Sequence, residues 1–312
     1  MATKAAPKPV EKPAPKPKLK RNDSASGPRT YDLPPLKEGD PAIRVPSVTS
    51  ILSALPKQDV LAPWAAKRER ELVVAAAARV YGNLVQDAQE DPFNPDAPLL
   101  LPRKSVVTPE VFDELVRQEL PKQKAHVTEM EEAAAIGTAV HAAIEAALLK
   151  EMGRPFEAPP ALTHPAAVEA FARYERWRAE VSFEPVMAEE QVWSRTFEFA
   201  GTLDFLAHIK HPVSGRRVLC LGDWKTSRGL YPEHGIQNAA YILALAEMGH
   251  VKARDTWGAI VRLPKVATDP GVEIHYLDPD TLEDRIQVFL STYNVWKWKN
   301  ATFLKNLGEV EG

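Results

Sequence analysis

The chain has 312 residues, of which 45% are hydrophobic and 26% are charged, and its formal net charge at pH 7 is −3. This length accommodates one large or two modest domains with a hydrophobic core. The single cysteine, Cys220, excludes an intramolecular disulfide and any all-cysteine zinc or iron–sulfur site within the chain. No run of about 18 apolar residues and no apolar secretory signal are present, so we expect a cytoplasmic protein without a membrane span.

The N-terminal stretch differs in composition from the rest of the chain. Residues 1–30 hold eight Lys or Arg against two Asp or Glu, a net charge of +6, and they are rich in Pro and Ala. Because no hydrophobic periodicity is present, we expect residues 1–38 to form a disordered or polyproline-like tail. We expect this tail to be dispensable for catalysis and to hold an acidic polymer weakly at low salt.

Residues 39–125 are expected to form a helical region that packs on the core. Ser47 or Thr49 can cap a short helix, and residues 61–84 have the composition of a long one. Four prolines between residues 86 and 105 indicate a loop. Thr108 then caps a further helix that extends to residue 120.

A long alanine-rich helix is expected over residues 127–153. Thr128 and Glu131 have the spacing of a capping box, and Gly153 is a suitable end. Three residues spaced by four share one face of this helix: Gly137, His141 and Glu145. A glycine inside a helix costs about 1 kcal/mol relative to alanine, so we expect another backbone to approach closely there. A second helix follows over residues 164–181.

The pattern changes to strands from residue 186 onward. Residues 186–199 form a strand pair or one long bent strand, and turn residues separate the next two strands. The later elements are expected in this order: strands 200–209 and 216–225, helix 231–249, strands 256–263 and 272–277, and helix 279–303. This order predicts an α/β fold in which helices flank a central mixed β-sheet, with additional helices at the N-terminal side.

Two acids and a lysine are brought together by the expected hairpin. A turn centred between residues 213 and 214 puts Asp204 directly across from Asp223, where Cβ atoms lie about 4.5–5.5 Å apart. Lys225 is on the same face of its strand as Asp223. Opposed carboxylates are destabilising unless a cation lies between them, and Mg²⁺ prefers one or two carboxylates with water and phosphate.

These motifs resemble the PD-(D/E)XK nuclease superfamily. "GTLD" followed by "GDWKTS" is similar to its two core motifs, and Gln237 and Tyr241 match the Q-x-x-x-Y signature of its RecB-like branch. "GTAVHAAIEAAL" is similar to the upstream helix of that branch, and "PSVTSIL" with "LAPWAAK" resembles phage-encoded members. The resemblance covers residues 44–300. Members with an iron–sulfur cluster carry four cysteines, so this chain resembles the cluster-free exonucleases.

The resemblance implies a restriction-endonuclease-like core over residues 126–305, followed by a tail over 306–312. It implies a Mg²⁺ or Mn²⁺ site, and the imidazole ligand favours Mn²⁺. The implied metal ligands are His141, Asp204, Asp223 and the backbone carbonyl of Trp224. Asp204, Asp223 and Lys225 are the implied catalytic residues. Lys225 would orient the attacking water or stabilise charge in the transition state.

Further residues are assigned to the surroundings of this site. The resemblance implies that Gln237 and Tyr241 line the site and contact the DNA strand. Glu145, Glu189 and Glu190 are candidates for accessory acids. DNA contacts are also expected from Trp296, Lys297, Trp298 and Lys299, which interleave aromatic rings with cations, and from Lys67, Arg68 and Arg70.

The leading hypothesis is a metal-dependent DNA exonuclease of phage or bacterial recombination, repair or replication. It would act in the bacterial cytoplasm beside a single-strand annealing or binding protein. A structure-specific endonuclease of the same fold and a catalytically inactive DNA-binding protein are the alternatives. A metal-binding protein without a nucleic-acid partner is a third, against which salt-sensitive DNA binding would count.

Overall fold

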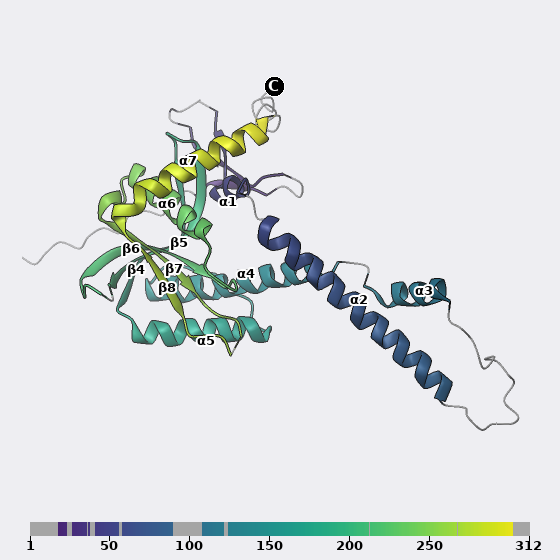
Figure 1. Cartoon of the computed structure of the whole chain (residues 1–312). Helices are drawn as coiled ribbons and strands as arrows, with labels where there is room; N and C mark the ends of the chain where they lie inside the picture. Colours follow the sequence, from purple (N-terminus) through teal and green to yellow (C-terminus); the bar gives the residue numbers. More distant parts are fainter. Residues whose placement is uncertain are drawn as a thin grey trace, which may run out of the picture.

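The computed structural model describes residues 18–23, 27–35, 37, 41–55, 58–89, 108–121, 124–211, 213–266 and 268–301. A five-stranded sheet of order β4-β5-β6-β7-β8 lies at its centre (Figure 1). Its strands are β4 (Phe183–Ser194), β5 (Phe199–Lys210), β6 (Arg217–Lys225), β7 (Thr256–Arg262) and β8 (Glu273–Leu277). Neighbouring strands are antiparallel except β6 and β7, which are parallel and are joined through α6 (Pro232–Glu247). The fold is therefore mixed α/β, as the sequence predicts.

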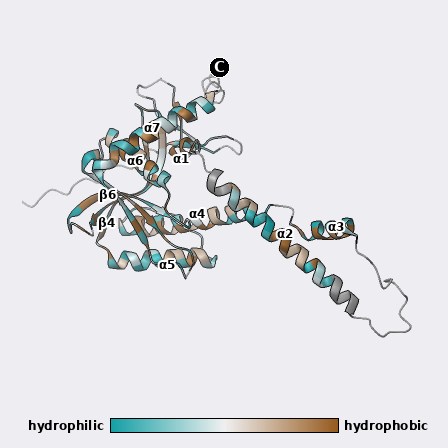
Figure 2. Ribbon diagram, in the orientation of Figure 1, coloured by the Kyte–Doolittle hydropathy of each residue, from teal (hydrophilic) through white to brown (hydrophobic). Residues whose placement is uncertain are grey.

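Helices cover both faces of this sheet. One core cluster joins strand residues to α4 (Ala125–Glu151) and α5 (Pro165–Glu180). The other joins them to α6, to α7 (Leu282–Lys299) and to the short α1 (Val48–Leu52). Short 3₁₀ turns precede β7 and α7, at Ala253–Asp255 and Pro279–Thr281. Hydrophobic colouring runs along the strands between the two helical layers (Figure 2), because a sheet covered on both faces buries side chains on both.

Helix α4 carries much of the site, and its ends differ in how well they were predicted. The predicted capping box at Thr128 is wrong, because the helix begins at Ala125 and its N-cap, Lys124, makes no side-chain cap bond. The carboxylate of Glu69 instead accepts the backbone N–H and the Nδ1 of His126 at 3.4 and 2.8 Å. The stop at Gly153 is confirmed by its left-handed φ of 63°.

Gly137 in α4 makes room for a close neighbour, although not for the backbone that was predicted. A Cβ built there would lie 3.2 Å from Oγ1 of Thr226, the residue that follows β6. The glycine therefore lets α4 approach the end of the strand that carries the predicted catalytic lysine.

Among the described residues, α4 is long and apolar enough to span a membrane by length and composition. Several of its apolar side chains pack inside the protein. Ile136, Val140, Ile144 and Leu148 are buried in the cluster shared with α5 and the sheet. This arrangement is compatible with a soluble protein.

The prediction of a disordered tail over residues 1–38 is wrong for the part that the structure describes. β1 (Lys20–Asn22) and β2 (Thr30–Leu33) form an antiparallel sheet with β3 (Ile43–Pro46). Leu19, Tyr31, Leu33 and Val45 pack with Ala200 of β5, and this burial is what orders a Lys- and Pro-rich segment. Residues 1–17 lie outside the described residues.

Of the helices predicted to pack on the core, α1 does so, whereas α2 (Gln58–Gln89) and α3 (Pro109–Glu119) pack on each other. Helix α1 is capped by Ser47, whose hydroxyl accepts the N–H of Ser50 at 3.0 Å, and it packs in the main core. Helix α2 reaches the start of α4 and extends away from the sheet (Figure 1). Thr108 caps α3 as predicted. Residues 90–107, most of the predicted loop, lie outside the described residues.

Replacing Leu33 by Ala should destabilise the protein by about 2–5 kcal/mol, because its side chain is 1% exposed. Ile43, its cross-strand partner in the same small sheet, is 42% exposed, so Ile43→Ala is the matched control and should cost far less. Urea denaturation measures both. Equal effects would mean that the N-terminal sheet does not pack on the body in solution.

Candidate functional site

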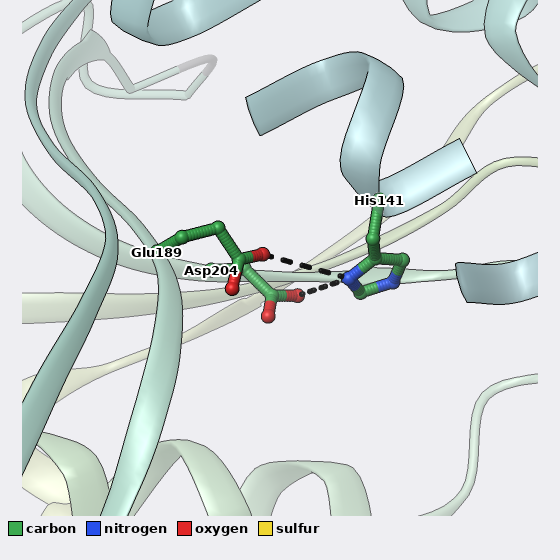
Figure 3. A group of neighbouring side chains, drawn as sticks. All are labelled: His141, Glu189 and Asp204. Carbon is green, nitrogen blue, oxygen red and sulfur yellow. Dashed lines mark ion pairs between the residues drawn. The ribbon is translucent and has the colours of Figure 1, made fainter. Parts of the chain in front are cut away.

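Three side chains from three different elements meet in one group (Figure 3). His141 comes from α4, Glu189 from β4 and Asp204 from β5. Nδ1 of His141 lies 3.7 Å from Oδ2 of Asp204 and 3.9 Å from Oε1 of Glu189. The three potential ligand atoms lie within 4.8 Å of one another, which is a suitable arrangement for a metal ion.

The predicted register of the β5–β6 hairpin is confirmed. Phe205 pairs with Gly222 and Lys210 with Arg217, and this register continues to put Asp204 across from Asp223. The backbone N–H of Trp224 donates to Oδ2 of Asp204 at 2.7 Å and ties that carboxylate to β6. Asp223 therefore lies beside the three-residue group, on the neighbouring strand.

Asp223 and Lys225 form a buried ion pair. Nζ of Lys225 lies 2.5 Å from Oδ2 of Asp223, and the two side chains are 20% and 2% exposed respectively. The same ammonium donates to Oε1 of Gln237 at 3.3 Å. Lys225 is thus held between an acid of its own strand and an amide of α6.

Gln237 and Tyr241, which match the signature on α6, are arranged in series behind Lys225. Nε2 of Gln237 donates to the phenol oxygen of Tyr241 at 3.3 Å. Tyr241 is 3% exposed and packs on Gly201, where a Cβ would lie 2.5 Å from its ring. Gln237 is half-buried, so of the two it is the side chain that a substrate can reach.

Burial and mutual repulsion dominate the electrostatics of the acids. Burial raises the pKa of Asp204, and the charge of Glu189 raises it further against the effect of His141. Burial and the charge of Asp204 likewise raise the pKa of Asp223, opposed by Lys225. Both carboxyls are therefore short of positive charge, and a cation in this cluster would stabilise their ionised forms.

At the two basic groups, the charges of the acids outweigh the effect of burial on the pKa. Burial alone would lower the pKa of His141, but Asp204 and Glu189 outweigh it and raise that pKa to about 9. Burial also opposes the charge of Lys225, yet Asp223 and Asp204 raise its pKa above the ordinary value. The imidazole and the ammonium are the positive groups that balance the acids in the protein alone.

The backbone carbonyl of Trp224, a predicted metal ligand, lies 3.0 Å from Nε2 of His141. In the neutral imidazole that a metal requires, Nε2–H would donate to this carbonyl and the lone pair of Nδ1 would be directed toward Asp204 and Glu189. The carbonyl therefore orients the imidazole, and its own ligand role stays a prediction. The indole is buried among Tyr174, Trp177, Phe183 and Phe205, which fixes this stretch of β6.

Of the three accessory acids considered, the structure brings only Glu189 to the cluster. Its backbone has φ of 47°, a left-handed conformation that costs a non-glycine residue on the order of 1–3 kcal/mol. Glu190 instead pairs with Arg154 at 2.6 Å, away from the site. Glu145 is also away from it: its charged neighbours are Lys18 and Glu157. Ala188 pairs with Phe205 and Glu190 with Leu203, so the ordinary alternation of the strand puts Glu189 on the face of Asp204 and Glu190 on the other face.

The more distant predictions of DNA contact are only partly compatible with the structure. Trp296 is 2% exposed and belongs to the core, whereas Trp298 is 79% exposed. Lys297 lies over the ring of Tyr293. Arg68 pairs with Glu71 and Glu129, and Lys67 lies near Glu71, so both cations already face acids.

A scan against protein-family models and a search of the curated proteins found no match for this chain.

The donor set itself fits a divalent cation. Two carboxylates and one imidazole converge, a third carboxylate lies on the adjacent strand, and the buried acids repel one another. Carboxylate oxygens suit Mg²⁺ and Mn²⁺, and an imidazole nitrogen shifts the preference toward Mn²⁺. His141, Glu189 and Asp204 are the residues that would hold the ion, with Asp223 on the neighbouring strand.

His141→Ala and Glu189→Ala should each weaken Mn²⁺ binding by roughly tenfold or more, because even groups behind the ligands commonly contribute that much. Glu190→Ala is the matched control: it removes the adjacent acid of the same strand and should leave Mn²⁺ binding within about twofold. Isothermal titration calorimetry on the folded variants measures all three. Equal losses for Glu189→Ala and Glu190→Ala would contradict this metal centre.

Proposed function

We propose that this chain is a metal-dependent DNA exonuclease with a PD-(D/E)XK core of the RecB-like branch. One observation carries the proposal: His141, Glu189 and Asp204 converge within 4.8 Å beside the Asp223–Lys225 ion pair. The order of the motifs along the chain and the α/β sheet that carries them support it. The proposal includes the bacterial cytoplasm as location, DNA recombination, repair or replication as process, and a single-strand annealing or binding protein as partner.

The site has the groups that hydrolysis of a phosphodiester requires. A bound Mg²⁺ or Mn²⁺ would lower the pKa of a coordinated water and would place a positive charge beside a phosphate oxygen. Asp204 is held by the N–H of Trp224, so its carboxylate is in place before substrate arrives. Glu189 and His141 complete the ligand set from the other two elements.

Lys225 has the geometry of a group that acts on the phosphate. Asp223 and Gln237 hold its ammonium at the edge of the acid cluster, with 20% of the side chain exposed. A positive charge fixed in this way can stabilise the charge that grows on phosphate oxygens in the transition state without reorganising. Since Asp204 and Asp223 keep the pKa of Lys225 raised, the amine is protonated at neutral pH and acts as a cation or proton donor.

Gln237 has a positioning role in this proposal, and Tyr241 supports it. The phenol of Tyr241 accepts from Gln237, which in turn accepts from Lys225. The tight contact with Gly201 fixes the tyrosine ring. DNA contact is therefore proposed for Gln237, while the buried Tyr241 acts through it.

The decisive experiment uses linear duplex DNA labelled at the 5′ or the 3′ end, with closed circular DNA alongside, in Mg²⁺ or Mn²⁺. An exonuclease degrades the linear DNA from an end and leaves the circles intact. Cleavage of closed circles would favour the endonuclease alternative. Salt-sensitive DNA binding without any cleavage would favour the inactive DNA-binding alternative, and the absence of both activities would reject the proposal.

Lys225→Ala should lower kcat by roughly two or more orders of magnitude, as the loss of an oxyanion-type donor does, with DNA binding retained. Lys225→Arg should not restore the rate, because a planar guanidinium does not replace a compact ammonium held by one acid and one amide. Single-turnover cleavage and fluorescence anisotropy separate the two effects, with circular dichroism to verify folding. Near wild-type cleavage by a folded Lys225→Ala protein would leave the ion pair as a purely structural feature.

A further inference from the structure

The loop that follows β6 is fixed in shape from two sides. Within it, the hydroxyl of Ser227 donates to the carbonyl of Gly229 at 2.7 Å. From β7, Nη1 of Arg262 donates to the carbonyls of Ser227 and Arg228 at 3.4 and 3.2 Å. Arg262 is 4% exposed and is held in turn by Glu273 at 2.6 Å. The backbone that presents Arg228 is thus ordered by a buried guanidinium.

This loop begins at the carboxyl end of β6, directly after the candidate catalytic residue Lys225. β6 and β7 are parallel, with Lys225 paired to Arg262, and the N–H of Leu263 donates to the carbonyl of Lys225 at 2.7 Å. Arg228 follows Lys225 by three residues, and Lys265 follows Leu263 by two. Arg228 and Lys265 therefore each lie just beyond the carboxyl end of one of these two parallel strands, close to Lys225 in the chain or across the pair.

Neither cation is neutralised by an ion pair with a described carboxylate. Arg228 is exposed, whereas Lys265 is half-buried. Burial and the nearby charge of Arg228 both lower the pKa of Lys265. The acid that acts in the other direction, Glu132, lies 3.0 Å from Nε2 of His164 and is engaged there. Two neighbouring cations that form no ion pair with a described acid, one of them partly desolvated, form a favourable place for an anion.

We propose that Arg228 and Lys265 bind a phosphodiester of the nucleic-acid strand, close to the linkage that Lys225 contacts. This assignment rests on the proposed function and adds a subsite to it. The guanidinium supplies a planar pair of donors and the ammonium a point charge, a combination that suits the two free oxygens of one phosphodiester. Such a contact would fix the register of the strand and would be the same for every base sequence.

The double variant Arg228→Gln with Lys265→Gln tests the subsite against a matched control. The control, Arg216→Gln with Lys252→Gln, removes two exposed cations near the opposite ends of the same strands. Binding of a fluorescein-labelled 20-mer duplex is measured in EDTA over a range of KCl concentrations. The loss of one phosphate contact should reduce the slope of log Kobs against log salt by about 0.9, and the control should keep the wild-type slope.

A methylphosphonate scan then locates the contact. Each linkage of the labelled strand is made uncharged in turn, and we expect one linkage near the cleavage position to weaken binding to the wild-type protein. In the Arg228→Gln, Lys265→Gln variant the same substitution should have no further effect, because the partner cations are gone. A linkage that matters equally in both proteins is contacted elsewhere.

The outcomes separate this inference from the function on which it rests. A wild-type protein that shows no salt-sensitive DNA binding overturns both. Salt-sensitive binding with the same slope in wild type and in the Arg228→Gln, Lys265→Gln variant overturns only the subsite. An equal drop in slope for the control variant would also overturn it, because the effect would then reflect net charge and not a contact.

Discussion

The concentration of negative charge on β4, β5 and β6 is the constraint on which the rest of the site depends. Glu189, Asp204 and Asp223 come from three adjacent strands, and burial together with their repulsion raises the pKa of both aspartates. Within the part of the chain that the structure describes, the cations that face them are those of His141 and Lys225. Buried charges of this kind require that the surrounding fold hold their geometry.

The surrounding fold provides that support through close packing. Phe205 lies over Gly222, where a Cβ would be 1.7 Å from the ring, so β5 and β6 are fixed in register at the residues next to the two aspartates. The indole of Trp224 is buried in an aromatic cluster, and its backbone holds Asp204 on one side and His141 on the other. Side chains that never approach a substrate thus determine where the ionisable groups point.

The parts of this site that could be predicted from the sequence are those that depend on local features of the chain. The hairpin register follows from a short turn, and α6 from an amphipathic pattern with Pro232 at its start. The sequence named Glu189 and Glu190 together but could not say which of them faces Asp204, because a register shift between Pro185 and Met187 interrupts the alternation of β4. The strands β1 and β2 were missed for another reason: their order comes from burial against Ala200, about 170 residues away, and not from local propensity.

The parallel pairing of β6 and β7 explains why several of the candidate residues lie near the carboxyl ends of these two strands. A parallel pair requires a crossover helix, so α6 begins just beyond the end of β6 and brings Gln237 back onto Lys225. The ends of both strands then open onto the same side, as in other α/β sheets that bind ligands there. Arg262 connects these features, because one guanidinium pairs with β8 and fixes the loop after Lys225. The candidate carboxylate ligands, Lys225 and the two cations proposed to bind phosphate are consequently attached to one sheet, and Arg262 orders the loop that carries Arg228.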